Sequence, residues 1–264
     1  MIQALWLTDI HLEFLEDDAF HNFLEILQQC EYDMLWITGD IAHGANVSQY
    51  LIKLAMTLQK PIYFVLGNHD FYGRKTNDVY EEMYIVSQNP YLTYLSASPV
   101  IEINANHALI GHDSWGDGRW GNYYASNITL NDFLVIRDFA GLDQEKILSR
   151  MQYLAHRSVV HIKKALKKAL KKYHHIWMLS HVTPFKETCL YGNEIADDNW
   201  LPFFCCKEMG DMLIEVMSQH PQQYLTVLSG HTHNEAHVQI SSNIHSIVGG
   251  AEYCEPCVQH IFTI

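Results

Sequence analysis

The stretch Pro61-Ile62-Tyr63-Phe64-Val65-Leu66-Gly67-Asn68-His69-Asp70 joins an apolar run to a group of polar residues. A short run rich in aliphatic and aromatic residues and ended by glycine predicts a buried strand. The polar residues Asn68, His69 and Asp70 then come directly after the strand. The stretch therefore predicts a sheet whose edge carries chemically active side chains.

Four further segments repeat this arrangement. The apolar runs Ile2–Thr8, Asp33–Thr38, Ile176–Leu179 and Tyr224–Leu228 lead into Asp9-Ile10-His11, Gly39-Asp40, Ser180-His181 and Gly230-His231-Thr232-His233. Helical periodicity fills several gaps between them, as at Phe20, Phe23, Leu24 and Leu27, at Val47, Leu51, Leu54 and Leu58, and at Val79, Met83 and Val86. Strands that alternate with helices predict a mainly parallel sheet, where ligands bind beyond the carboxyl ends of the strands. We therefore expect all five polar segments to share one site.

The rest of the chain predicts further strands and one long helix. Residues 100–103 and 108–110 form a predicted hairpin, and the runs 236–240, 244–248 and 258–264 are predicted strands without intervening helices. These last runs favour a partly antiparallel second sheet packed on the first. A helix is predicted over 143–173, and its lysine-rich end is typical of a solvated surface helix more than of a membrane-surface helix. Because no linker-like tract interrupts the 264 residues, we expect a single domain, 1–264.

Composition narrows the class of partner. The formal net charge of −13 disfavours polymeric nucleic acid and anionic membranes. No apolar run approaches the ~18–20 residues of a membrane span, and Met1 leads directly into a predicted strand. The six cysteines are scattered, and the lone C-x-x-C at 254–257 is weak support for a zinc or redox site. These features favour a cytoplasmic protein.

The polar segments supply a mixed set of metal ligands. Residues i and i+2 of an extended strand end point to the same side, so Asp9 with His11, and His231 with His233, could each grip one cation. The set is completed by the Asp40 carboxylate, which could bridge two metals, the Asn68 amide oxygen and the His181 imidazole. Such a shell suits two divalent ions of the Mn, Fe, Zn, Ni or Co type.

Two such ions can support phosphate-ester hydrolysis. When they lie ~3.5–4 Å apart, they can hold a bridging hydroxide and clamp the attacking and leaving oxygens of a phosphate. His69, beside Asn68, could donate a proton to the leaving alkoxide. Asp70 could hydrogen-bond the His69 imidazole and raise its pKa.

The complete pattern D-x-H, G-D, G-N-H-D/E, H and G-H-x-H resembles the calcineurin-like metallophosphoesterase family over nearly the whole chain. The resemblance implies an α/β, four-layer αββα sandwich with two mixed β-sheets flanked by helices. It implies one metal bound by Asp9, His11, Asp40 and His233, a second bound by Asp40, Asn68, His181 and His231, and catalytic assistance from His69. Purple acid phosphatases have tyrosine where this chain has His43, which disfavours that subgroup. Scaffold members of the superfamily lack the histidine that matches His69, so its presence here favours an enzyme.

One glycine- and aromatic-rich segment, 111–124, is a candidate for substrate contact. Arg119 could bind a phosphate bidentately, and Trp115 or Trp120 could stack on a base. The alternative is a surface loop whose aromatic side chains pack on the core. His43, His112 and Lys186 are further substrate candidates.

The leading function is a metal-dependent phosphohydrolase that cleaves a small phosphodiester or phosphomonoester, such as a nucleotide, by attack of a metal-bridging hydroxide. A nuclease is the first alternative, and the acidic surface disfavours it. The second is a non-catalytic binding scaffold on the same fold, which the complete ligand set disfavours. No feature selects a protein phosphatase. Substrate identity, native metals and oligomeric state stay open.

Overall fold

The strands form two sheets in a computed structural model that describes residues 1–192 and 194–264. The first sheet has the order β13 (His260–Thr263), β1 (Gln3–Leu7), β2 (Met34–Thr38), β3 (Ile62–Val65) and β4 (Leu92–Tyr94). The second has the order β11 (Ala236–Ser241), β12 (Ile244–Val248), β10 (Tyr224–Ser229), β7 (His175–Ser180), β6 (His107–His112) and β5 (Ile101–Glu102). A small hairpin pairs β8 (Leu190–Tyr191) with β9 (Glu194–Ile195).

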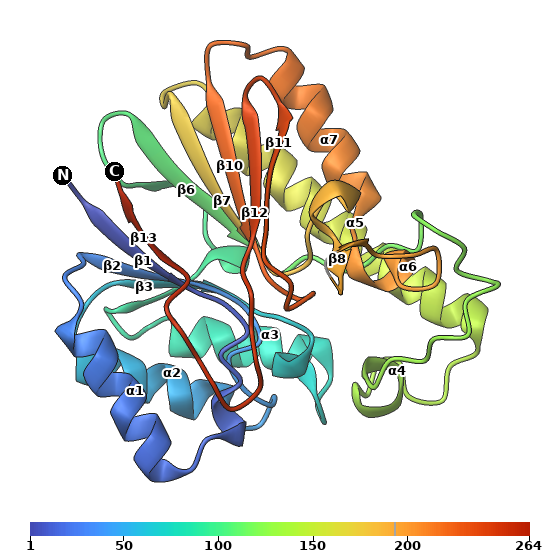
Figure 1. Cartoon of the computed structure of the whole chain (residues 1–264), viewed down its shortest axis with the longest axis horizontal. Coiled ribbons are helices and arrows are strands. Elements are labelled where there is room, and N and C mark those ends of the chain that lie inside the picture. Colours follow the sequence, from blue (N-terminus) through green and yellow to red (C-terminus); the bar gives the residue numbers. More distant parts are fainter. Residues whose placement is uncertain (193) are drawn as a thin grey trace.

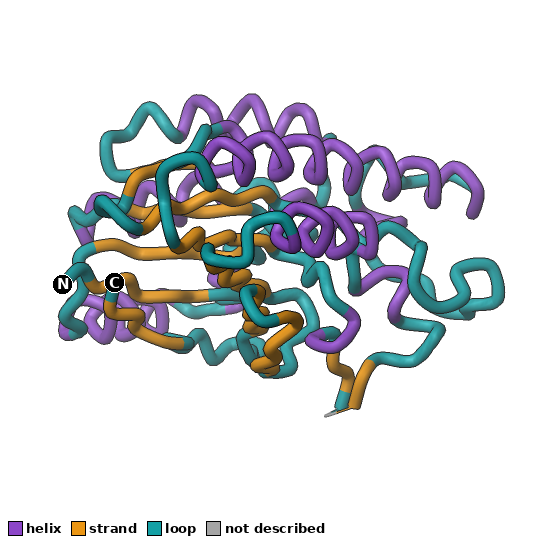
Figure 2. The backbone as a smooth tube through the Cα atoms, turned by 90° about the horizontal axis from the view of Figure 1, so that it is seen from above, coloured by secondary structure: helices purple, strands orange, loops and turns teal. Residues whose placement is uncertain are grey.

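Helices cover the outer faces of the two sheets (Figures 1 and 2). The first sheet is flanked by α1 (Asp17–Gln29), α2 (Val47–Leu58) and α3 (Thr76–Val86), and the second by α5 (Gln144–Ala169) and α7 (Lys207–Ser218). Short helices are α4 (Asp132–Val135), α6 (Leu201–Phe204) and the 3-10 turns η1 (Leu12–Phe14), η2 (His69–Phe71), η3 (Leu95–Ala97) and η4 (Lys186–Thr188). The predicted four-layer αββα sandwich with two mixed sheets is confirmed.

The strands β1, β2 and β3 of the first sheet are buried on both faces, which explains why they are continuous apolar runs. In β1, Leu5 and Leu7 pack toward the helices, whereas Trp6 packs between the sheets. Trp36 and Trp177 meet across the sheet interface with ring centroids 5.3 Å apart. The two sheets are thus held face to face by large aromatic side chains, and their strand ends are brought to a common edge.

Two details differ from the sequence prediction. The last strand was expected with its neighbours in the second sheet, but β13 pairs antiparallel with β1, with Gln3 opposite Thr263. The physical reason is aromatic packing, because Phe262 lies 4.9 Å from Trp177 and 6.2 Å from Trp6 between ring centroids. Helix α7 was not predicted, although its buried side chains recur at helical spacing.

The other predicted elements are present, whereas β4, β8, β9, α4 and α6 were not predicted. The hairpin β5–β6 is antiparallel as expected, and α5 covers most of the predicted long helix. Among the described residues, no helix has both the length and the apolar character needed to cross a membrane.

Candidate metal centre

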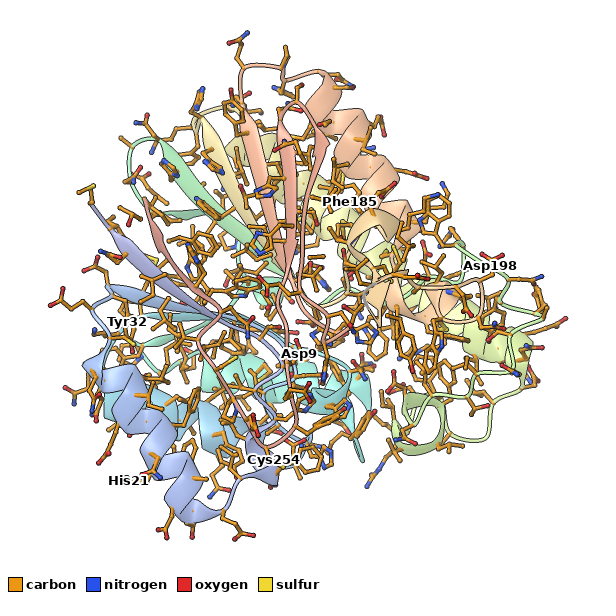
Figure 3. The ribbon with its side chains drawn as sticks, viewed as in Figure 1. Asp9, His21, Tyr32, Phe185, Asp198 and Cys254 are labelled. Atoms are coloured by element: carbon orange, nitrogen blue, oxygen red, sulfur yellow. The ribbon has the colours of Figure 1, made fainter. Side chains whose placement is uncertain are left out.

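The seven predicted metal ligands lie in five loops, each of which follows the carboxyl end of a strand. These strands are β1, β2 and β3 of the first sheet and β7 and β10 of the second. In Figure 3, Asp9 lies near the centre of the view, where strands of both sheets end. The site is therefore built jointly by the two sheets.

A first cluster of donor atoms joins two carboxylates and two imidazoles. His11 Nε2 lies 3.3 Å from His233 Nε2 and 3.7 Å from Asp40 Oδ2. His233 Nε2 lies 3.4 Å from Asp9 Oδ1. One ligand atom from each of the four residues lies within 4.8 Å of all the others, a spacing that could hold a metal ion.

A second cluster lies against the first. Asn68 Oδ1 lies 3.1 Å from His181 Nε2 and 3.0 Å from His231 Nδ1, and these two nitrogens are 3.2 Å apart. His181 Nε2 also lies 3.5 Å from Asp40 Oδ2, the same oxygen that faces His11. Asp40 Oδ2 thus belongs to both clusters, as expected of a bridging carboxylate.

Hydrogen bonding indicates which ring nitrogens can accept a cation. His181 Nδ1 lies 2.8 Å from the carbonyl oxygen of Thr38 and must carry a hydrogen to bond it, which leaves Nε2 with a free lone pair in the neutral ring. Burial lowers the pKa of His181, and it lowers the pKa of His231 to about 3. Neutral imidazoles with converging lone pairs are the form that binds a metal.

Hydrogen bonds from neighbouring groups hold both carboxylates in place. Asp9 Oδ2 accepts a hydrogen bond from Thr8 Oγ1 at 2.6 Å, and the Asp9 carboxylate also accepts from the backbone N–H of His231 at 3.0 Å. Asp40 Oδ1 accepts from the backbone N–H of His69 at 2.9 Å, which leaves Oδ2 facing both clusters. Backbone donors therefore orient both side chains.

The two buried carboxylates affect each other's ionisation. Burial and the neighbouring charge of Asp9 raise the pKa of Asp40 well above its usual value. Burial also acts to raise the pKa of Asp9, but the hydrogen bond with His233 and the charges of nearby histidines outweigh it, and this pKa falls below its usual value. Two buried carboxylates beside imidazole nitrogens form a donor set that a divalent cation fits.

The convergence of the ligands has a different backbone origin from the one predicted. An extended strand end was expected, but five of the seven residues have positive φ angles. They are Asp9 (47°), His11 (39°), Asp40 (48°), His231 (74°) and His233 (57°). Left-handed backbone costs non-glycine residues on the order of 1–3 kcal/mol each, and such strain concentrates at functional sites. Tight turns, not the strand pleat, direct these side chains inward.

Two glycines allow this close approach of the loops. A β-carbon on Gly67 would overlap the Asp40 carboxylate and the His181 ring. A β-carbon on Gly230 would overlap the Asp9 carboxylate. The glycines in the G-N-H-D and G-H-x-H segments are therefore needed for packing at the site.

His69 lies beside the first cluster. Its ring is stacked on Tyr72 at a centroid distance of 4.3 Å and lies edge-on to His11 at 4.6 Å. Burial lowers the pKa of His69 to about 2. Among the described residues, its buried Nδ1 has no hydrogen-bond partner.

The predicted hydrogen bond between Asp70 and His69 is wrong. The Asp70 carboxylate instead accepts from the backbone N–H groups of Ile41, Ala42 and Gly67 at 2.9, 3.0 and 2.8 Å. These three backbone donors occupy the Asp70 oxygens, so the carboxylate does not bond the His69 ring. Asp70 thus joins the loop after β2 to the loop after β3.

Sequence reasoning missed several residues around the site. Glu13 is buried, and its carboxylate lies 3.6 Å from His11 Nδ1 and 3.3 Å from His43 Nε2. Asp132 accepts from Asn68 Nδ2 at 2.9 Å, which turns the amide oxygen of Asn68 toward the histidines. The Tyr253 ring lies 4.7 Å from the His11 ring. An acidic residue two positions after His11 was a usable signal for Glu13, whereas the other two come from distant segments with no local pattern.

The predicted substrate contacts are scattered in the fold. His43 is 42% exposed and lies 5.7 Å from His69 between ring centroids. Trp115 is only 5% exposed and packs in the core, and His112 is buried against His161. Arg119 is paired with two carboxylates, Asp117 and Glu208, each at 3.2 Å. The structure therefore brings His43 to the site, and packs Trp115 and His112 as the alternative reading expected.

The last two candidates lie together elsewhere. Lys186 Nζ is 4.5 Å from the centre of the Trp120 ring, and Lys207 Nζ covers the same ring at 5.1 Å. Trp120 also packs against a small cluster that includes Cys189 and Leu201. Its indole ring is thus engaged within the protein.

Comparisons with known proteins agree with this geometry. The sequence model of a family described as calcineurin-like phosphoesterase matches residues 2–235. A search of curated proteins found no match. Among solved structures, a phosphopantetheinyl hydrolase from Mycobacterium tuberculosis is 12% identical, with a TM-score of 0.66 and coverage of 94% of this chain and 89% of the other.

Two further structures are similar. A dimetal phosphatase from Danio rerio has a TM-score of 0.59 at 12% identity, over 94% of this chain and 87% of the other. The protein TT1561 of Thermus thermophilus has a TM-score of 0.51 at 13% identity, over 94% of this chain and 89% of the other. At these identities the likeness shows a shared fold.

Proposed function

The chain belongs to the calcineurin-like phosphoesterase family, and from this premise we propose that it is a metal-dependent hydrolase of a small phosphodiester or phosphomonoester. The observation that carries the proposal is the shared oxygen of Asp40, which faces His11 at 3.7 Å and His181 at 3.5 Å. A single carboxylate oxygen between two sets of imidazoles supports a two-metal centre. Because the site draws on both sheets, we propose that the chain works as one domain.

The proposed ligands divide as the two clusters do. Asp9, His11, Asp40 and His233 would hold one divalent ion, and Asp40, Asn68, His181 and His231 the other. Mn, Fe, Zn, Ni and Co all suit this mixture of oxygen and imidazole donors. When bound, such ions polarise a phosphate ester and make water a better nucleophile at neutral pH.

The chain's own residues would handle the proton and the geometry. We propose that His69 donates a proton to the leaving oxygen, since its ring lies 4.6 Å from that of His11 and packs on Tyr72. Burial and the nearby histidines lower the pKa of His69 in the free protein, and the negative charge of a bound phosphate would raise this pKa and favour the protonated ring. Asp70 would act through position, because its carboxylate fastens the loops that carry Asp40 and His69. Asp132 would likewise orient Asn68.

The acidic composition favours a small substrate over a polymer. With a formal net charge of −13, the protein repels nucleic-acid backbones, so a nucleotide-sized ester fits better than DNA or RNA. Among the predicted substrate contacts, we keep His43, because its side chain is 42% exposed and lies beside His69.

Manganese-supplemented hydrolysis of bis-p-nitrophenyl phosphate, measured beside p-nitrophenyl phosphate, tests the proposal. We expect turnover with the wild type and its loss in Asp40→Asn. Asp211→Asn, at an exposed carboxylate paired with Lys207, is the matched control and should keep activity. Bound metal with no turnover on any ester would instead support a non-catalytic scaffold, and cleavage confined to single-stranded DNA would support a nuclease.

A further inference from the structure

A cavity of about 440 Å³ lies in the part of the molecule that joins α4, the start of α5 and the loop before α6. In Figure 1 these elements gather at one end of the fold, beyond the second sheet. Its apolar lining includes Tyr123, Ile128, Phe133, Leu134, Leu142 and Phe203. Its volume is in the range of natural small-molecule sites.

The cavity lies next to the candidate metal centre, and the two are separated by two aromatic side chains that line both. A narrower pocket is lined by three proposed metal ligands, Asn68, His181 and His231, and it shares Phe133 and Phe203 with the larger cavity. These two rings pack against each other with centroids 5.7 Å apart. A pair of aromatic side chains therefore separates the larger cavity from the ligands of the second cluster.

Helix α4 links the two spaces physically. Its first residue, Asp132, accepts hydrogen bonds from Asn68 Nδ2 at 2.9 Å and from the Tyr72 hydroxyl at 2.7 Å. The next two residues, Phe133 and Leu134, line the cavity. A ligand that fills the cavity would thus press on the helix that orients Asn68.

The lining has five polar side chains, and three of them, Tyr123, Ser126 and Gln144, are hydrogen-bonded within the protein, whereas Asn127 and Thr129 add uncharged polar groups. Ser126 Oγ donates to the carbonyl oxygen of Asn199, and the Tyr123 hydroxyl donates to that of Gln144. The Gln144 amide donates in turn to the carbonyl oxygen of Tyr123. Among the described lining residues, none carries a formal charge, so the cavity favours a neutral, apolar group.

Leu134 is the most accessible apolar side chain of this lining. Leu134 lines the cavity and is 65% exposed to solvent, whereas its neighbour Phe133 is buried. An apolar ligand would cover surface that water now contacts, and burial of such surface favours binding.

We propose that this cavity is a subsite for the apolar leaving group of the phosphate ester, so that the substrate is the phosphate of an alcohol with a hydrocarbon arm. This inference rests on the proposed function. In the reaction, an oxygen of water bonds to phosphorus and releases a proton, and the bond between phosphorus and the leaving oxygen breaks. The leaving oxygen takes a proton from His69, and the proton released by the water replaces the one that His69 has lost. The products are phosphate, or a phosphomonoester from a diester, and an alcohol whose arm occupies the cavity.

The test measures kcat and KM for ethyl, butyl, hexyl and octyl phosphate with the manganese-loaded enzyme, by release of inorganic phosphate. Each methylene that the cavity buries should lower KM by about fourfold until the cavity is full. Leu134→Glu should remove this dependence on chain length, and the conservative Leu134→Met should keep it. Ile85→Glu changes an equally exposed apolar side chain on α3 that does not line the cavity, and it should also keep the dependence.

A second readout is independent of turnover. The neutral fluorescent probe N-phenyl-1-naphthylamine should bind the metal-free protein, be displaced by octyl phosphate and bind weakly to Leu134→Glu. The subsite would be overturned if the wild type had the same KM for every chain length. The proposed function would stand in that case, provided that turnover is lost in Asp40→Asn. No turnover on any of these four monoesters would overturn the subsite, and a further absence of turnover on bis-p-nitrophenyl phosphate and p-nitrophenyl phosphate would overturn the proposed function.

Discussion

His181 Nε2 and His231 Nδ1 lie 3.2 Å apart, with Asn68 Oδ1 within 3.1 Å of both. Because His181 commits its Nδ1 hydrogen to Thr38, its Nε2 faces the other two atoms as a lone pair. When the neutral His231 ring carries its hydrogen on Nε2, its Nδ1 presents a third lone pair, and three acceptor atoms that point at one another favour a cation among them. Burial lowers the pKa of both histidines and favours neutral rings, the form that binds a metal.

Metal binding should therefore stabilise the folded protein. A ligand that binds only the native state at 100 times its Kd adds about 2.7 kcal/mol, which corresponds to a rise in Tm of about 5–10 °C for a chain of this size. We expect this rise when manganese is added to chelator-treated protein, measured by differential scanning calorimetry. Asp40→Asn should lose most of the shift and Asp211→Asn should keep it. An equal shift in both variants would place the stabilising metal elsewhere.

Replacement of His69 should separate catalysis from metal binding. We expect His69→Gln to lower kcat by about 10²–10⁴-fold for an alkyl phosphate, because a poor leaving group needs a proton donor. The loss should be smaller for p-nitrophenyl phosphate, whose leaving group needs less help. Metal content, measured by elemental analysis of the purified variant, should stay at the wild-type level. Equal losses on both substrates together with lost metal would contradict the proton-donor role.

Glu13 should control metal affinity through His11. The Glu13 carboxylate lies 3.6 Å from His11 Nδ1, beyond hydrogen-bond distance, and its charge there favours a hydrogen on Nδ1, which leaves Nε2 with a lone pair toward the cluster. Carboxylates that orient a ligating histidine typically contribute about 10–100-fold in metal affinity, so we expect Glu13→Gln to raise the Kd by that factor. Isothermal titration with manganese measures it. Glu16→Gln, at an exposed position just before α1, is the matched control, and an unchanged Kd in Glu13→Gln would reject this role.

Residue type and strand pattern were sufficient to predict which side chains meet at the site. The D-x-H and G-H-x-H segments each follow a buried strand, and parallel strands end at one edge. The reason given for their convergence was wrong, because Asp9 and His11 have φ angles of 47° and 39° where extended backbone was expected. A two-residue spacing is compatible with either a pleat or a tight turn, and the sequence does not distinguish them.

Contacts between distant segments could not be predicted from one sequence. Asp132 orients Asn68 across 64 residues of chain, and Phe133 meets Phe203 only because the 111–145 region folds against the α6 region. The same limit applies to β13, whose place beside β1 depends on packing among Trp6, Trp177 and Phe262. Local periodicity predicts a helix or strand and the face that it buries, but it does not predict which distant segment packs against that face.

Acid should destabilise the fold through His175, which lies at the start of β7, away from the metal centre. Its ring is stacked on Trp177 at 4.8 Å, and its Nε2 lies 2.8 Å from Thr226 Oγ1. Burial, with the nearby charges of His107 and His174, lowers the pKa of His175 from 6.5 to about 4. Between these two pH values the unfolded chain binds a proton that the native state does not. Stability is therefore full above pH 6.5 and falls as the pH drops toward 4.

Urea unfolding of the metal-free protein at pH 7.5 and pH 5.0 measures this loss. One histidine can contribute at most about 1.4 kcal/mol per pH unit, and the partial exposure of His175 reduces that figure. We expect His175→Gln to be less stable than the wild type at pH 7.5, because it loses the stacking on Trp177. The gap should narrow at pH 5.0, because glutamine takes up no proton on unfolding. The control His21→Gln, at an exposed residue on α1, should have the same free energy of unfolding as the wild type at both pH values. A difference between His175→Gln and the wild type that is equal at the two pH values would exclude a role of His175 protonation.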